Sequence, residues 1–441
     1  MTNNRYDVVI IGGGFAGVTA ARELSRTGKS VLILEARDRL GGRTHYEEVP
    51  QLGRSVEMGG TWVHWFQPHL WSELNRYGVD LVESIGAAAP EQVIYRTNGE
   101  RKLAEIDDAW PILESAITKF FADHAQTALP RPFDPLFAAE KIKEFDGYSC
   151  QDRIDVLGVS DEQKDLLNAM WSLCCGGAAS DGGFVTMLRW YALSGYTPSG
   201  IFDTCTRFKI NGGTKRLLEE INADSNAEIR LNAPVSAVST TDDGTTIVLR
   251  DGERIPCSAV VVTVPLNVLA DIEFTPPLSE GMRNAANRKQ ASKGLKLWVR
   301  VKGDLPRPLF AMAPDDEVFH YAHTEDIYDD GQLLVVFGPD PEKLADVESP
   351  EDVQPHIRRL LGDCIDVVAT SGKNWHDDEF AKGAWSVYRP GQLTESLAAL
   401  QDPTPPVFLA GGDIASGWNG FIDGAIESAH TIARQVNEYL P

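Results

Sequence analysis

The 441-residue sequence lacks the features that mark several classes of protein. No apolar run approaches the roughly 18 residues that a membrane-spanning helix needs, so no such helix is expected. The formal net charge of −23 argues against nucleic-acid binding, which needs a basic surface. An acidic surface attracts cationic small molecules at long range, although solubility alone also explains it. The first ten residues carry no charged segment followed by a long apolar segment, so no signal peptide is predicted.

The six cysteines form no disulfide framework. They include no C-x-x-C pair, and the adjacent Cys174 and Cys175 are poorly placed for an ordinary disulfide. Unpaired thiols are typical of a reducing compartment, so the sequence predicts a cytoplasmic protein. His320 and His323 lie within an acidic, loop-like segment, residues 315–330, but the pattern offers no third ligand and no metal site is predicted.

The clearest signal in the chain lies near its N-terminus. Residues 8–11 are uniformly apolar, which is typical of a parallel strand buried on both faces. They lead into the pattern G-x-G-x-x-G. Gly12 permits a tight turn, Gly14 lets the backbone approach a pyrophosphate, and Gly17 lets the next helix lie close to the strand. A second apolar run ends at Glu35, where an acid can bind ribose hydroxyls. The sequence therefore predicts a Rossmann-like dinucleotide-binding unit.

Two further glycine pairs follow this unit. Gly41, Gly42 and Arg43 can bring backbone amides and a guanidinium to a phosphate, although the triplet alone is more often a plain turn. The second pair precedes aromatic residues, a pattern that favours backbone passing close to a flat ligand with aromatic side chains beside it. The residues of interest in this stretch are Gly59, Gly60, Thr61, Trp62, His64 and Trp65.

These motifs, together with a C-terminal segment, resemble the flavin-dependent amine oxidase family, which includes monoamine, polyamine and amino-acid oxidases. In the C-terminal segment an apolar run ends in Gly411, Gly412 and Asp413, and a helix opens shortly after Trp418. A helix N-terminus flanked by glycines favours a flavin phosphate or the negative charge of reduced flavin. The resemblance extends nearly end to end. Residues 59–69 are most similar to the nicotine-oxidising bacterial members.

The resemblance implies roles that the residue pattern alone does not. An isolated lysine in a strand, such as Lys296, usually faces solvent, but the family holds a lysine here, bridged by water to flavin N5. A buried lysine would have a lowered pKa, because desolvation disfavours its charge. Trp385 and Phe421 match the two walls of the aromatic cage over the flavin, where many relatives carry tyrosine in place of Phe421. Without the resemblance, both would be assigned to the core.

The cofactor implied by the resemblance is FAD. It is expected to be non-covalent, because Gly383 and Ala384 occupy the positions next to the cage tryptophan where some relatives carry a tethering cysteine. The residues expected to bind FAD are Gly12, Gly14, Phe15, Ala16, Gly17, Glu35, Ala36, Arg37, Gly42, Arg43, Gly59, Gly60, Thr61, Trp62, Val235, Gly412, Asp413, Gly420, Phe421 and Ile422. Those expected to line the substrate pocket are Trp62, His64, Trp65, Trp385 and Phe421, and the expected catalytic residues are Lys296, Trp385 and Phe421.

The expected fold is α/β, with two interleaved domains. Residues 1–84, 206–290 and 385–441 are expected to form a Rossmann-like FAD-binding domain, and residues 85–205 and 291–384 an α+β substrate-binding domain. Apolar spacing predicts helices over residues 106–124 and 161–173, and residues 228–235 read as one strand.

The predicted reaction is oxidation of a C–N bond. An unprotonated amine lies between Trp385 and Phe421, a hydride leaves its α-carbon for flavin N5, and the resulting imine hydrolyses. A nicotine-type alkaloid (nicotine, pseudooxynicotine or 6-hydroxynicotine) is the first substrate class, and a primary arylalkylamine is the second. An FAD electron-relay protein without amine chemistry is the alternative of a different class. The same motifs serve oxygen or a protein carrier as electron acceptor, and a homodimer is implied by the family alone.

Overall fold

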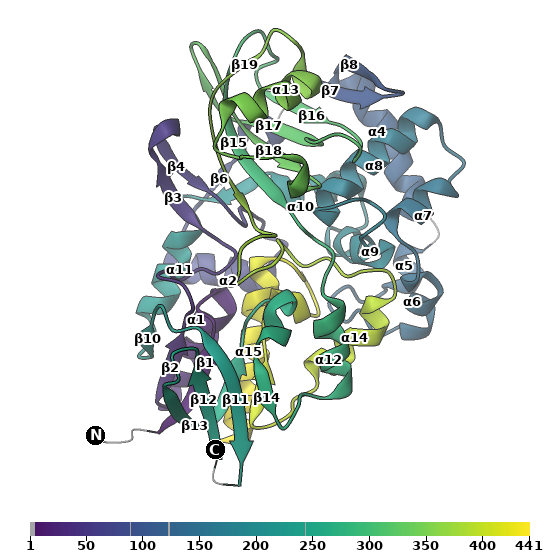
Figure 1. Ribbon diagram of the computed structural model, residues 1–441. Coiled ribbons are helices and arrows are strands. Elements are labelled where there is room, and N and C mark those ends of the chain that lie inside the picture. Colours follow the sequence, from purple (N-terminus) through teal and green to yellow (C-terminus); the bar gives the residue numbers. More distant parts are fainter. Residues whose placement is uncertain (1–4, 89, 122–123, 243) are drawn as a thin grey trace.

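A computed structural model describes residues 5–88, 90–121, 124–242 and 244–441. Figure 1 shows one large sheet close to the two termini, a second large sheet at the opposite end, and a block of helices beside the second sheet. The strands of each sheet come from widely separated parts of the chain, so the backbone passes repeatedly between the two halves.

The first sheet is built around β1 (Tyr6–Ile11). This strand pairs in parallel with β2 (Val31–Leu34) on one side and β13 (Arg254–Val262) on the other. Its alternate side chains enter hydrophobic clusters on opposite faces of the sheet. The prediction of a parallel strand buried on both faces is confirmed. The other strands of this sheet are β10 (Glu228–Arg230), β11 (Val235–Thr241), β12 (Gly244–Leu249), β14 (Glu273–Thr275) and β20 (Val407–Leu409).

Helices cover both faces of this sheet. On one face α1 (Phe15–Arg26), α11 (Thr214–Ala223) and α15 (Ile422–Tyr439) pack their apolar residues against it. On the other face, α12 (Glu280–Arg288) packs against a cluster that includes β11 and β12. The resulting arrangement leaves the carboxyl ends of β1 and β2 facing the second half of the molecule.

The second sheet has the strand order β19-β15-β18-β17-β16-β7-β8. These strands are β7 (Gln92–Thr97), β8 (Glu100–Glu105), β15 (Leu295–Lys302), β16 (Leu309–Met312), β17 (Tyr321–Tyr328), β18 (Gly331–Gly338) and β19 (Asp366–Asn374). Helix α13 (Pro350–Leu361) covers one face. The helical block covers part of the other and consists of α4 (Ile106–Phe121), α5 (Ala125–Ala128), α6 (Ala139–Asp146), α7 (Cys150–Asp155), α8 (Asp161–Cys175), α9 (Phe184–Leu193) and α10 (Pro198–Thr206).

Smaller elements connect the two halves. They are β3 (Tyr46–Val49), β4 (Arg54–Glu57), β5 (Trp62–Val63), β6 (Leu81–Glu83), β9 (Phe208–Ile210), α2 (Pro68–Tyr77), α3 (Ile85–Ala88), α14 (Gln392–Gln401) and four short 3-10 turns at Pro50–Leu52, Leu266–Asp271, Pro341–Lys343 and Gly412–Ile414. Strands β5, β9 and β6 form one small sheet, and β3 and β4 form another.

Three sequence predictions differ from the structure. The acidic segment 315–330 is not a loop throughout, because β17 forms there between two other strands. Residues 228–235 form the end of β10 and the start of β11, separated by a turn, rather than one strand. Helix α4 ends at Phe121, and residues 122–123 of the predicted helix lie outside the described residues. The residue limits of the two domains stay a prediction.

Among the described residues, no helix combines the length and the apolar character that crossing a membrane requires.

Candidate active site

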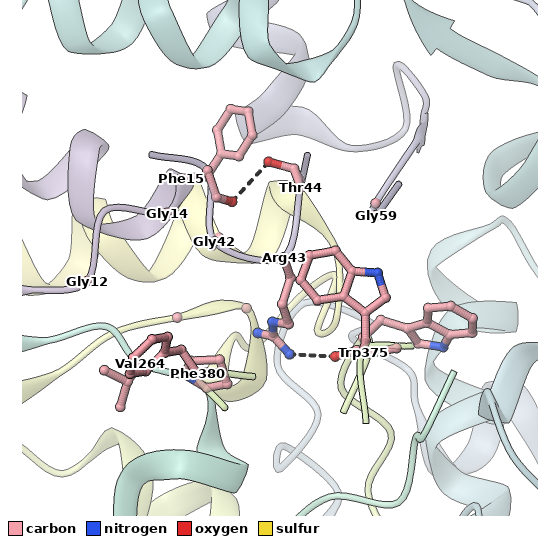
Figure 2. Close-up of a pocket in the computed structure, with 18 of the residues that line it drawn as sticks. Gly12, Gly14, Phe15, Gly42, Arg43, Thr44, Gly59, Val264, Trp375 and Phe380 are labelled. Carbon is pink, nitrogen blue, oxygen red and sulfur yellow. Dashed lines mark hydrogen bonds between the residues drawn. The ribbon is translucent and has the colours of Figure 1, made fainter. Parts of the chain in front are cut away.

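An elongated cavity lies where the two halves meet. It is lined by the glycine-rich turns of the first sheet, by β15, β17 and β18 of the second sheet, and by the N-terminus of α15. Figure 2 shows Gly12, Gly14 and Gly42 along one side, Val264 and Phe380 on the opposite side, and Arg43 reaching between them. Polar backbone dominates one end of the cavity and aromatic side chains dominate the other.

The polar end is formed by the turn between β1 and α1. Gly12 has a φ of 110°, a conformation that side-chain-bearing residues rarely adopt. Gly14 is the N-cap of α1, and no side chain caps this helix, so its first N–H groups face the cavity. A Cβ on Gly17 would lie 2.0 Å from the carbonyl oxygen of Gly12, so only glycine fits there. These contacts match an anion site at a helix N-terminus.

Glu35 lies at the end of β2, where hydrogen bonds fix its carboxylate. The side chain is buried, and its Oε2 accepts a hydrogen bond of 2.7 Å from Gly13 N, while Oε1 accepts one of 2.9 Å from Arg37 N. Both carboxylate oxygens are therefore fixed by backbone amides, and the carboxylate lines the cavity. This position suits an acceptor for ribose hydroxyl groups.

Arg43 connects three segments of the chain around the middle of the cavity through hydrogen bonds. Its Nη1 donates to Ala384 O at 2.9 Å, and its Nη2 donates to Asp413. The second oxygen of Asp413 accepts from Leu266 N at 2.8 Å. Gly59 passes directly beneath this arginine, because a Cβ there would lie 2.0 Å from Arg43 O. Asp413 therefore does not line the cavity itself. It holds the side chain of Arg43, which does.

The N-terminus of α15 faces the same region. Phe421 is the N-cap residue, no side chain caps the helix, and Ile422 and Ala425 line the cavity. Gly420 has a φ of 83°, and a Cβ there would lie 2.8 Å from Ser386 O. The free amides at this helix end favour a group that carries negative charge.

Lys296 lies between the polar and the aromatic ends. Its Nζ donates to Gly59 O at 2.9 Å and to Thr61 Oγ1, and it lies 5.0 Å from the ring centroids of both Trp62 and Trp298. The side chain is buried, and this burial lowers the pKa of Lys296 to about 7. Both the ammonium and the neutral amine are therefore accessible to this side chain near neutral pH.

Strand register explains the position of Lys296. It pairs with Phe337 on β18, which in turn pairs with Tyr321 on β17, so the three side chains form one row across the sheet. All three line the cavity. The neighbours Leu295 and Leu297 belong to the cluster beneath α13, on the other face.

The aromatic end contains the two predicted cage residues. Trp385 donates from Nε1 to Cys174 O at 2.8 Å, and its ring lies 6.0 Å from that of Phe337. Phe421 packs edge-on against Trp190 and Trp418, with ring centroids 5.0 Å apart in each pair. Both cage residues line the cavity. The other residues at this end are Leu173, Cys174, Trp190, Cys205, Thr206, Tyr321 and Phe337.

The structure brings most of the predicted site residues together but leaves four outside the cavity lining. Gly17 lies behind the turn, and Asp413 acts through Arg43. His64 is buried and pairs with Asp203 at 3.0 Å, while Trp65 is 42% exposed and packs against Phe208. Strand β5 ends at its second residue, so the alternation that places Trp62 in the cavity does not continue to His64 and Trp65.

Other lining residues were not singled out from the sequence. Arg250, Glu379 and Phe380 line the polar end, and Thr263 to Pro265 follow β13 at the same edge as the glycine turn. The apolar run of β13 could have predicted that Thr263 to Pro265 line the cavity, because neighbouring parallel strands end at the same edge of a sheet. Tyr321 had no such signal, since its segment was interpreted as a loop.

One group of potential metal ligands occurs in the described part of the chain. Ligand atoms of His69, Asp423 and Glu427 lie within 4.8 Å of one another. However, Asp423 Oδ1 accepts from Leu70 N in the first turn of α2, and Asp423 itself lies in the first turn of α15. The positive ends of two helix dipoles disfavour a cation here, and Asp423 is better described as the cap of α2.

Comparison with known proteins agrees with this geometry. The sequence model of the flavin containing amine oxidoreductase family matches residues 15–437. The chain belongs to this family.

Two curated relatives are similar over almost their whole length. The chain is 41% identical over 441 residues to the pseudooxynicotine dehydrogenase of a Pseudomonas species, which covers 100% of this chain and 88% of that protein. It is 37% identical over 435 residues to the nicotine dehydrogenase of Pseudomonas putida strain DSM 28022 / S16, with 99% and 89% covered. Putrescine oxidase solved with putrescine bound has the same fold, with a TM-score of 0.81 at 22% identity over 99% of both chains.

In a flavin-containing amine oxidoreductase, the cavity described above has to accept a dinucleotide and a substrate. The residues present fit FAD. The N-terminus of α1 offers amides to a pyrophosphate, Glu35 offers a carboxylate to a ribose, and the cavity continues past Gly59 and Gly60 to Lys296, where a flat ring would lie. The prediction of an amine oxidoreductase fold and family is confirmed, whereas the roles of individual residues stay predictions.

Proposed function

We propose that this protein oxidises a nicotine-type amine with non-covalently bound FAD. The observation that supports the substrate class best is the composition of the aromatic end. Trp385, Phe421 and Trp190 surround it, and the acidic residues that line the cavity are Glu35, Asp271 and Glu379 at the polar end. An aromatic, uncharged amine matches such an enclosure better than a polyamine with two cationic ends.

The relatives support the same class. Proteins named for pseudooxynicotine and nicotine are 41% and 37% identical to this chain over nearly its full length. The chain has an aromatic-lined pocket of the kind that a pyridine ring with an alkylamine can fill, and the acidic residues of the cavity lining lie at its other end.

The chain's own residues bind, orient and shield the substrate. FAD supplies the acceptor for a hydride when it is bound. The faces of Trp385 and Phe421 orient the amine nitrogen and its α-carbon toward the region of Lys296, and the surrounding aromatic side chains exclude water. Because no carboxylate among the described lining residues lies at this end, the neutral amine is the form that binds. Lys296 holds an exchangeable proton next to the reacting centre.

Non-covalent attachment rests on the two residues that precede Trp385. These are Gly383 and Ala384, and neither side chain can form a thioether to a flavin. Oxygen or a protein electron carrier would serve as acceptor with this same site. A homodimer and a cytoplasmic location stay predictions of the sequence.

Product analysis tests the proposal. The purified protein would be incubated with nicotine, pseudooxynicotine, 6-hydroxynicotine, phenethylamine and putrescine in the presence of an artificial electron-accepting dye, and products would be identified by mass spectrometry. Conversion of one pyridine alkaloid to its hydrolysed imine is expected. Conversion of phenethylamine alone would assign the primary-amine class, and conversion of putrescine alone would contradict the interpretation of the aromatic end.

A further inference from the structure

A series of buried and half-buried charged side chains lies between Lys296 and the molecular surface, along the seam between the two halves. It contains Glu57 at the end of β4, Lys209 on β9 and Glu325 on β17. Lys209 pairs with Glu325, and Arg54 lies 3.8 Å from the same carboxylate. The buried carboxylates of Glu57 and Glu325 thus lie near three cationic side chains, of which only Lys296 is fully enclosed.

The first residue in this series is Glu57. Its backbone carbonyl accepts a hydrogen bond of 3.0 Å from Trp298 Nε1, two residues along β15 from Lys296. Two residues further along the chain, Gly59 O accepts from Lys296 Nζ. These two hydrogen bonds hold the backbone of residues 57–59 against the segment of β15 that carries Lys296. One side-chain oxygen of Glu57 accepts from Thr214 N, and the other has no hydrogen-bond partner among the described residues.

Lys296 is held in the same place in either protonation state. Its two hydrogen-bond partners, Gly59 O and Thr61 Oγ1, both accept, and the Thr61 hydroxyl is directed to Gly59 O by its own hydrogen bond of 3.0 Å. A neutral amine has two N–H groups and satisfies both acceptors, whereas an ammonium has one more. The third proton is thus the one that can be gained or lost without moving the side chain.

We propose that Glu57 is the positioning residue that determines whether Lys296 is charged. The Lys209–Glu325 pair changes the charge of Lys296 to a smaller extent. The claim about charge does not depend on amine chemistry. Its catalytic consequence, a lysine that can exchange a proton beside the flavin ring, rests on the proposed function. The aromatic cage thus orients the substrate, and Glu57 determines the protonation state of Lys296.

Opposing effects act on Lys296, and Glu57 is the largest favourable charge. Desolvation disfavours the ammonium, whereas Glu57 and then Glu325 favour it, and Lys209 opposes it. The faces of the surrounding aromatic rings also favour the cation. Burial in turn raises the pKa of Glu57, and the hydrogen bond from Thr214 N and then the charge of Lys296 counteract this rise.

The other titratable groups in the seam leave this assignment intact. His323, on β17, is fully buried, and burial together with the nearby lysines lowers its pKa to about 3, so it is neutral. Its Nδ1 shares a 2.8 Å hydrogen bond with the hydroxyl of Tyr321. Arg54 and Asp326 pair at the partly exposed rim of the seam, where solvent screens their charges.

Nuclear magnetic resonance of lysine-labelled holoprotein tests the proposal directly. The Lys296 signal would be assigned by its loss in Lys296→Met, and its titration midpoint would be followed in Glu57→Gln, Glu57→Asp and Glu48→Gln. Glu57→Gln should lower the midpoint by about 1–2 pH units. Glu57→Asp should restore most of it, and Glu48→Gln, an exposed residue of the same hairpin, should not move it. An unchanged or raised midpoint in Glu57→Gln would overturn the proposal.

Stability measurements keep the proposal testable if Glu57→Gln folds poorly. At a pH below the titration midpoint of Lys296, removing Glu57 leaves the lysine charge uncompensated, so the double variant Glu57→Gln/Lys296→Met should there have a higher urea midpoint than Glu57→Gln alone. Purely additive effects of the two substitutions would refute the coupling. Neither measurement uses an amine or turnover, so a wrong substrate assignment would leave both results interpretable.

Discussion

Replacing Lys296 by methionine should change how stability depends on pH. Burial lowers the pKa of Lys296 from 10.5 to about 7, while an unfolded lysine keeps its ordinary value. Between these two values the unfolded chain binds a proton that the folded protein does not. The free energy of unfolding of the wild type, measured relative to Lys296→Met, should therefore be flat below about pH 7 and rise above it.

The size of this rise follows from how far the pKa of Lys296 is lowered in the folded protein. One pH unit corresponds to about 1.4 kcal/mol, so the difference between the two proteins should grow by about 4 kcal/mol from about pH 7 to about pH 10. Removing Lys296 also takes away a charge that favours the ionised form of Glu57. This loss likewise makes the difference in unfolding free energy between the two proteins increase with pH. Urea unfolding at a series of pH values measures the effect. A difference that stays constant across this range would refute the assignment of a buried lysine with a lowered pKa.

Four further predictions concern the cofactor and the substrate. Gly17→Ala places a Cβ 2.0 Å from Gly12 O, so it should cost about 1–3 kcal/mol in urea unfolding and reduce flavin content, whereas Gly158→Ala, with nothing within 4 Å, should do neither. Arg43→Met removes the partner of the buried Asp413 and should cost about 1.5–3 kcal/mol by the same assay, with loss of flavin. Acid precipitation should release the yellow colour into the supernatant, and colour in the pellet would show a covalent link. Because the neutral amine binds, kcat/KM should rise about tenfold per pH unit below the substrate's pKa, and a flat profile would contradict this.

The cofactor half of the site could be predicted from the sequence because its determinants are local. A strand, a glycine turn and a helix within residues 8–26 place Gly12 and Gly14 without reference to the rest of the chain. Glu35 follows from the same unit, since β2 must end at the same edge as β1. The spacing of glycines and apolar residues is enough to specify this geometry.

The substrate half depends on contacts between distant strands. Lys296 is buried because β15 pairs with β18 and is covered by residues of β4 and β5, and no pattern within β15 alone reveals this. Tyr321 was missed because β17 is acidic, and its burial depends on its place inside the sheet. His64 and Trp65 were expected in the pocket because aromatic residues follow the glycine pair, but that pattern does not show where β5 ends or which way each side chain points.

Anaerobic mixing of the purified protein with a single amine tests the central claim most directly. Loss of the flavin absorption band would be followed in a stopped-flow instrument, with nicotine, pseudooxynicotine and phenethylamine compared at equal concentration and the Phe421→Ala variant as a matched control for the aromatic cage. The account predicts fast, complete bleaching by one pyridine alkaloid and a rate that falls in the variant while its flavin stays bound. Bleaching by none of these amines, in protein that carries its full complement of flavin, would contradict it.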